Sequence, residues 1–136
     1  MTQRYMLDTN VVSHIMQGRD AALMAHLTQV PVGQVVISSV TLAELEYGLH
    51  RKGQPARLKA AMTQVLLRMD VLPWDEAVAR RYGVLCSSLE ARGISLSDLD
   101  MMIAAHAVAA DAILVSRDKA FAQVPEPLRL ETWHAA

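Results

Sequence analysis

Four acidic residues that are far apart in the sequence have the side chains needed for metal-dependent chemistry. They are Asp8, Glu44, Asp100 and Asp118. No His or Cys stands beside them at ligand spacing, so the available donors are all oxygens, which suit Mg²⁺ or Mn²⁺ better than Zn²⁺. A divalent cation held by carboxylates over a cleft can activate water and stabilise a phosphorane-like transition state. The residue types therefore point to metal-dependent hydrolysis of a phosphate ester.

Gathering these carboxylates in one place has an electrostatic cost. Two carboxylates about 5 Å apart repel by about 3 kcal/mol at an effective dielectric of about 20. A protein keeps such an arrangement only if protons or cations relieve it. The formal net charge of −1 becomes −1 + 2 = +1 with one divalent ion and −1 + 4 = +3 with two. The low net charge therefore does not exclude a nucleic-acid substrate.

Each acid also has a simpler, structural interpretation. Thr41 and Glu44 have the spacing of a capping box, and Ser97 and Asp100 are spaced similarly. Acids are common in first helical turns because they oppose the helix dipole. Taken singly, each acid is better explained as structural, but the four together favour a site. His106 lies on the apolar stripe of its helix, so we expect a hydrogen-bonded core histidine rather than a catalyst.

The elements that must position the acids alternate between strands and helices. Short apolar runs predict strands at 5–7, 34–38, 71–73, 112–116 and 128–131. Periodic segments predict helices at 11–17, 20–29, 41–51, 55–69, 75–92 and 97–110. This order predicts a parallel sheet with helices on both faces, in which ligands bind beyond the carboxyl ends of the strands. All four acids are expected at that edge, after a strand or in the first turn of a helix.

Composition limits the class of protein. The chain has 136 residues, of which 52% are apolar, so we expect a single domain over residues 1–136 with a substantial core. No apolar run approaches the roughly 20 residues that span a bilayer, and the beginning of the chain lacks a signal-peptide pattern. Cys86 is the single cysteine, which excludes an internal disulfide or a cysteine-based zinc site. A reducing, cytoplasmic setting is expected, with no membrane association.

Several blocks of the sequence resemble the PIN-domain ribonucleases. These blocks are Leu7–Asn10, Ile37–Leu45 with Tyr47 and Gly48, Asp100–Ala107, and Leu114–Asp118 with Phe121. The segment Leu130–Trp133 resembles the usual ending of VapC-type toxins. The resemblance extends from Met6 to Trp133. It implies a three-layer α/β/α fold around a parallel sheet of order 3-2-1-4-5, and a magnesium-dependent endoribonuclease in which Mn²⁺ can substitute.

The resemblance also assigns roles by position. The family's acidic quartet, which holds the metal and carries catalysis, matches Asp8, Glu44, Asp100 and Asp118. The small polar residues that support this quartet match Thr9, Asn10 and Ser116.

Two positions depart from the family pattern. Asp98 is an extra acid that competes with Asp100 as a ligand, although the spacing to Ile103 favours Asp100. Arg117 stands where many toxins carry Asn, which leaves open a contact with an RNA phosphate. Arg51 and Lys52 belong to a basic group, completed by Arg57 and Lys59, that is either a solvated helix end or a second phosphate contact.

The function expected from the resemblance is that of the toxin in a type II toxin–antitoxin pair. Such a toxin cuts a structured RNA, for example a tRNA, to inhibit translation. Its expected partners are a VapB-like antitoxin and a second copy of the chain. The absence of an added nucleic-acid module favours this over a PIN nuclease of RNA processing or a structure-selective DNA nuclease.

Two other classes remain as alternatives. A phospho-receiver domain also places acids at strand ends and a late lysine, here Lys119, but Asp8 lacks the acidic neighbour that such a domain needs. A catalytically dead PIN fold used for binding is disfavoured because all four acids are present.

Apolar residues in the first four predicted helices exceed what one face of a small sheet obviously needs. They are Ile15, Met16, Leu23, Met24, Leu27, Leu42, Leu45, Leu49, Leu58, Met62 and Leu66. We expect part of this surface to form a groove for an amphipathic helix of the antitoxin. Core packing explains the same residues about equally well.

Overall fold

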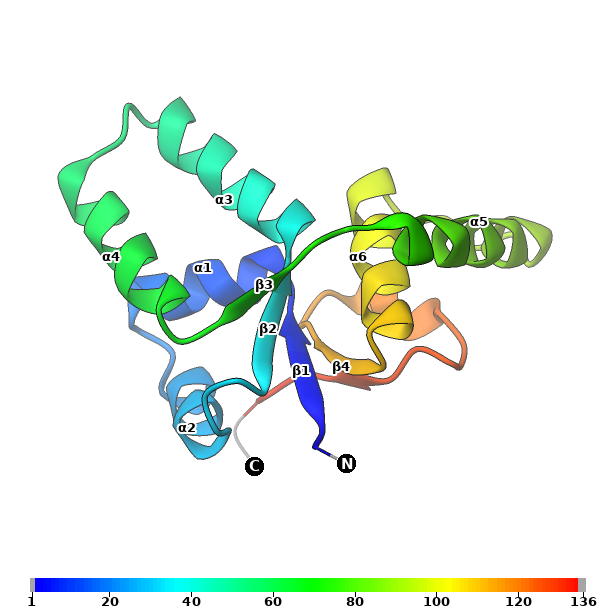
Figure 1. The fold of residues 1–136 in the computed structure, drawn as a ribbon, viewed down its shortest axis with the longest axis horizontal. Helices are drawn as coiled ribbons and strands as arrows, with labels where there is room; N and C mark the ends of the chain where they lie inside the picture. The colour runs from blue at the N-terminus through cyan, green and yellow to red at the C-terminus, as the bar shows by residue number, and fades with distance from the viewer. Residues whose placement is uncertain (1, 135–136) are drawn as a thin grey trace.

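The protein is built around a five-stranded parallel sheet, which a computed structural model describes within residues 2–134 (Figure 1). The strands are β1 (Arg4–Leu7), β2 (Val35–Ser38), β3 (Asp70–Leu72), β4 (Ala112–Val115) and β5 (Leu130–Glu131). Their order is β3-β2-β1-β4-β5, and every neighbouring pair is parallel. The predicted fold class and strand order are therefore confirmed.

Helices connect the strands where the periodic segments predicted them. They are α1 (Thr9–Gln17), α2 (Ala21–Gln29), α3 (Ser39–Arg51), α4 (Ala56–Leu66), α5 (Glu76–Ala91) and α6 (Asp98–Ala109). Gly18 ends α1 with a positive φ of 70°, a conformation that glycine adopts without strain. A short 3-10 helix, η1 (Lys119–Gln123), follows β4 and was not predicted. Across residues 2–134, no helix is both long and apolar enough to cross a bilayer.

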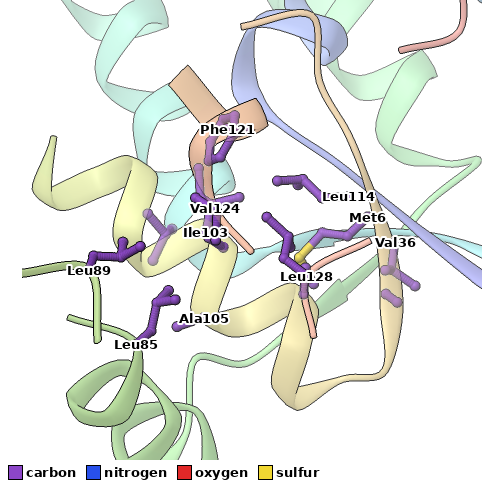
Figure 2. Close-up of a cluster of buried hydrophobic side chains, with 14 residues drawn as sticks. Met6, Val36, Leu85, Leu89, Ile103, Ala105, Leu114, Phe121, Val124 and Leu128 are labelled. Atoms are coloured by element: carbon purple, nitrogen blue, oxygen red, sulfur yellow. The ribbon is translucent and has the colours of Figure 1, made fainter. Parts of the chain in front are cut away.

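Successive side chains of the strands point to opposite faces of the sheet, and helices cover both faces. Met6 of β1 packs with the residues of α5, α6 and η1, whereas Leu7 packs with those of α1, α2, α3 and α4. Figure 2 shows the first of these cores, in which Ile103, Leu114 and Phe121 are buried together. Because both faces are covered, the central strands β1, β2 and β4 read as nearly continuous apolar runs.

The connections bring several helix starts to one edge of the sheet. Asp8 ends the extended backbone of β1 and caps α1, and Ser38 ends β2 and caps α3. The amino end of α6 lies at the same edge because this helix runs back along β4 (Figure 1). Gly93, with a φ of 69°, turns the chain out of α5 toward α6. Asp8 and the helix starts that precede Glu44 and Asp100 therefore lie at the carboxyl edge.

Candidate active site

Asp8 is the buried centre of the acidic group, with 4% of its surface exposed. Its Oδ1 accepts a 2.9 Å hydrogen bond from the Val11 backbone N–H, and its Oδ2 accepts a 2.5 Å bond from Ser116 Oγ. Burial raises the pKa of Asp8, these two hydrogen bonds lower it, and the charges of Asp100 and Asp118 raise it further. The net shift is upward, so the folded protein disfavours an uncompensated negative charge here.

Asp100 and Asp118 lie near enough to Asp8 for the three charges to affect one another. Burial is the main cause that raises the pKa of Asp100, and the charge of Asp118 adds to it. Asp100 is in the first turn of α6, as predicted, and its backbone N–H donates to the capping hydroxyl of Ser97 over 3.2 Å. Asp118 caps η1 and is exposed.

Glu44 approaches the same region from α3. Its Oε1 accepts a 2.6 Å hydrogen bond from Thr9 Oγ1, which lies 3.4 Å from the hydroxyl of the buried Thr41. The capping-box interpretation of Thr41 and Glu44 is wrong, because α3 begins two residues earlier than predicted and is capped by Ser38. Glu44 therefore lies in the second turn of α3, where its carboxylate is tied to α1.

Ser116 connects two of the acids. Its hydroxyl donates to Asp8 and accepts a 3.1 Å hydrogen bond from the Asp118 backbone N–H. Its own backbone N–H donates to Glu131 of β5 over 3.0 Å. This side chain is 1% exposed, so its hydroxyl is committed to the acids.

His106 joins the helices that carry Glu44 and Asp100. Its Nδ1 lies 2.7 Å from Ser38 Oγ, the hydroxyl that caps α3, and its side chain is buried. Burial lowers the pKa of His106, which favours the neutral ring. The prediction of a hydrogen-bonded core histidine is confirmed.

Arg117 takes a different place from the one expected. Its guanidinium pairs with Asp20 and donates to the backbone carbonyls of Thr132 and Trp133, over 3.2 and 2.8 Å. These bonds use most of its donors inside the protein. The expectation of an RNA-phosphate contact is corrected accordingly, since the side chain that would make it is already bound.

The remaining predicted residues lie around the acids. Asn10 is exposed on α1. Asp98 is exposed at the start of α6. The pKa of Tyr82 in α5 is raised mainly by a hydrogen bond with Cys86 and by burial, and the charge of Asp98 adds to the increase. Asp98 therefore lies toward α5, and it is not among the charges that shift Asp8 or Asp100.

Arg51 and Lys52 line a cavity of about 720 Å³ between α1, α3 and α4. Thr9 and Glu44 line the same cavity, so it opens onto the acidic group. The Arg51 guanidinium lies 5.5 Å from the ring centroid of Tyr47, and both side chains are exposed.

Comparison with known proteins decides the family. The family model of the PIN domain matches residues 5–127. The chain belongs to the PIN-domain family. It is 32% identical to Ribonuclease VapC2 of Haemophilus influenzae over 96% of this chain and 98% of that protein. It is equally similar, over the same shares, to the tRNA(fMet)-specific endonuclease VapC of Shigella flexneri.

Solved structures agree with this placement. The DNA-bound VapBC of Salmonella typhimurium superimposes with a TM-score of 0.89 at 28% identity, covering 98% of this chain and 100% of that one. VapBC2 of Rickettsia felis, bound to a DNA fragment from its promoter, gives a TM-score of 0.87 at 28% identity, with 95% and 98% covered. The predicted VapC-type ribonuclease is confirmed at the level of the family, and a phospho-receiver domain is excluded.

PIN-domain nucleases of the VapC type generally depend on a divalent metal. The donors at this edge fit such an ion, because all four carboxylates supply hard oxygen ligands, and burial together with neighbouring carboxylate charges raises the pKa values of Asp8 and Asp100. Within residues 2–134, no three His, Cys, Asp or Glu side chains converge closely enough to hold an ion as they stand. The four expected acids thus do not form a closed set of metal ligands in this arrangement.

Several residues of this PIN domain's site were not found from the sequence. Thr41 contacts Thr9, and Arg19 lines the cavity beside the basic group. The sequence offered Thr41 only as the apparent start of a capping box with Glu44, which gave no sign of its contact with Thr9. Asp20, the partner of Arg117, carried no signal beyond that of a helix cap.

Proposed function

We propose that this PIN-domain protein is a magnesium-dependent endoribonuclease that cleaves structured RNA of the tRNA class and acts as the toxin of a type II toxin–antitoxin pair. The observation that carries the metal-dependent activity is the place of the buried Asp8, held by Val11 and Ser116 close enough to Asp100 and Asp118 for their charges, after burial, to raise its pKa. The tRNA class is supported by a relative 32% identical that is named a tRNA(fMet)-specific endonuclease.

The residues of the chain prepare the site for a cation. Asp8 is held at both oxygens by Val11 and Ser116, and each oxygen keeps a free lone pair. Thr9 orients Glu44, and Ser116 fixes the backbone of Asp118. A bound Mg²⁺ would supply activation of water and stabilisation of the negative charge that develops on the phosphate.

The substrate backbone would reach the acids along the cavity that Arg51 and Lys52 line. Both side chains are exposed, so they are free to meet phosphates. Contacts of this kind position RNA without reading its sequence, and they weaken as salt increases.

The same cavity suits the inhibitory partner. Its apolar lining consists of the partly exposed Met16 and Leu58 and the buried Leu45, Leu49 and Met62, and its rim carries the exposed basic residues Arg19, Arg51, Lys52 and Arg57. An amphipathic helix of a VapB-like antitoxin would lay its apolar face on these walls. Solved VapBC complexes of similar fold support this partner. An Arg or Lys of the antitoxin would then be close enough to neutralise the acids.

Other apolar residues of the predicted groove serve the core instead. Ile15, Leu23 and Leu27 are buried beneath α1 and α2, so they are not available to a partner. Association of two copies of the chain stays a prediction. Light scattering that gives twice the 14.9 kDa of one chain would support it, and a mass of one chain would contradict it.

RNA cleavage tests the proposed activity directly. The purified protein is incubated with total RNA and Mg²⁺, and new RNA ends are mapped by sequencing. We expect a small number of cut sites within structured RNA, and none with an Asp8→Asn variant. Intact RNA with the wild-type protein, in either Mg²⁺ or Mn²⁺, would contradict the proposal.

A further inference from the structure

Arg117 lies in the chain between two residues of the acidic site but does not face it. Ser116 donates to Asp8, and Asp118 is one of the interacting carboxylates. The Arg117 side chain reaches instead to Asp20, the cap of α2, and to the carbonyls of Thr132 and Trp133. The turn after β4 is therefore bonded to Asp8 through Ser116, and to α2 and the segment after β5 through Arg117.

The groups that Arg117 binds are themselves firmly placed. Asp20 Oδ1 accepts a 3.1 Å hydrogen bond from the Leu23 backbone N–H at the start of α2. Hydrogen bonds from Arg117 and from Leu23 lower the pKa of Asp20 to about 2, so the ion pair persists at any ordinary pH. The Asp20 and Arg117 side chains are 27% and 21% exposed, which limits screening by solvent.

Trp133 provides the second anchor. Its ring is buried, stacks on His26 of α2 at 5.3 Å with an interplanar angle of 9°, and lies 5.8 Å from Tyr5 of β1. Its Nε1 donates to Glu131 over 3.0 Å. One side chain, Arg117, thus joins the turn after β4 to α2 and to the segment after β5.

We infer that Arg117 is a positioning residue that sets the place of Ser116 and Asp118 relative to Asp8, and so tunes the affinity of the site for its metal. This inference rests on the proposed metal-dependent function. Residues that hold metal ligands through hydrogen bonds commonly change metal affinity by about 10-fold to 100-fold when they are replaced. Arg117 acts one step further out, so we expect the lower end of this range.

The alternative is that Arg117 only stabilises the fold, and Arg129 offers a matched control. Its guanidinium pairs with Asp111 over 3.1 Å and donates to Gln3 Oε1 over 2.8 Å. This network also joins distant segments, but it lies where β4 begins, at the opposite edge of the sheet from Asp118. A general loss of stability should follow from either substitution, whereas a change in metal affinity should follow only from Arg117.

The experiment measures Mn²⁺ binding by calorimetry, without RNA, for the wild type and for Arg117→Ala, Arg117→Lys, Asp20→Asn and Arg129→Ala. Asp20→Asn is the mild variant, because asparagine still caps α2 while the ion pair is lost. A further pair, Asp118→Asn with and without Arg117→Ala, tests whether Arg117 acts through Asp118. Thermal unfolding of each variant verifies that it is folded at the temperature of the titration.

We expect Arg117→Ala to weaken Mn²⁺ binding by about 10-fold, Asp20→Asn and Arg117→Lys to weaken it less, and Arg129→Ala to leave it unchanged. On the Asp118→Asn background, Arg117→Ala should cause little further loss. Wild-type affinity in both Arg117→Ala and Asp20→Asn, or an equal loss in Arg129→Ala, would overturn the inference while leaving the proposed function intact. A wild-type protein that binds no Mn²⁺ would overturn both.

Discussion

Thr9 Oγ1 donates a 2.6 Å hydrogen bond to Glu44 Oε1, and so joins the first residue of α1 to the second turn of α3. The two residues are 35 positions apart in the chain. This bond ties the Glu44 carboxylate to the residue that follows Asp8, while Ser38 caps the start of its own helix. We therefore predict that Thr9 orients Glu44 beside Asp8 for metal binding.

Replacing Thr9 with valine tests this role, because valine keeps the shape and removes the hydroxyl. We expect RNA cleavage to fall by about 10-fold to 100-fold, the range for residues that orient metal ligands, with a nearly unchanged melting temperature. Thr28→Val is the control, since the Thr28 hydroxyl bonds only the Ala25 carbonyl on an exposed face of α2. Equal cleavage rates for both variants would show that the bond to Glu44 has no part in catalysis.

The raised pKa of Asp8 predicts how the metal-free protein responds to pH. As the pH rises past 3.8, the ordinary pKa of an aspartate, Asp8 loses its proton in the unfolded chain but keeps it in the folded protein. Stability contributed by the protonated group is therefore lost as the pH rises toward the raised folded pKa. Asp8→Asn removes this loss and keeps a residue that can still cap α1.

We therefore expect metal-free Asp8→Asn to melt at least as high as the wild type at about pH 7, with the difference shrinking as the pH falls toward 3.8. Its cleavage of RNA should be lower by more than about 100-fold, beyond the loss from a supporting residue. Thermal unfolding in a chelator at several pH values provides the measurement. A much lower melting temperature for the variant at neutral pH would mean that Asp8 is a structural cap.

Asp100 should show the same relief of repulsion and should also carry the effect of metal on stability. A ligand that binds only the folded state stabilises it by about 2.7 kcal/mol at 100 times its Kd. We expect saturating Mn²⁺ to raise the melting temperature of the wild type but not of Asp100→Asn. Asp98→Asn is the matched control, because it removes a neighbouring acid that lies toward Tyr82. An equal response to Mn²⁺ in Asp100→Asn and the wild type would assign the ion elsewhere.

The toxin role predicts a phenotype that depends on a partner. Expression of the chain alone should stop growth, and co-expression with the product of the neighbouring gene should restore it. Inhibition of purified protein by this product should weaken at high salt, because the charges that meet at the acids and the basic rim are screened. Normal growth on expression of the chain alone, while purified protein still cuts RNA, would favour a processing nuclease.

The sequence was sufficient for the strand-end acids because their positions follow from simple rules. Asp8 and Asp118 each follow a buried apolar strand, and the alternation of strands and helices makes those strands parallel. Parallel strands end at one edge, so the convergence of these acids could be predicted without a structure. The position of Asp100 could also be predicted, because the helix before β4 must run antiparallel to that strand and so begins at the same edge.

Other features depended on tertiary contacts that spacing does not reveal. The start of α3 was predicted at Thr41, because Thr41 and Glu44 have the spacing of a capping box, whereas Ser38, the last residue of β2, is the actual cap. Arg117 and Asp20 are 97 residues apart, and nothing in either segment specifies their pairing. Helical periodicity alone also could not separate Leu23, which is buried in the core, from Met16, which lines the cavity.

The central claim, that these carboxylates hydrolyse RNA by means of a divalent metal, is tested most directly by removing and restoring the ion. Purified protein is stripped with a chelator, and cleavage of a tRNA pool is followed before and after Mg²⁺ is added in excess of the chelator. We predict no cleavage in the chelator, full recovery with Mg²⁺, and no recovery for Asp100→Asn. Undiminished cleavage by the wild type in the chelator would contradict the account.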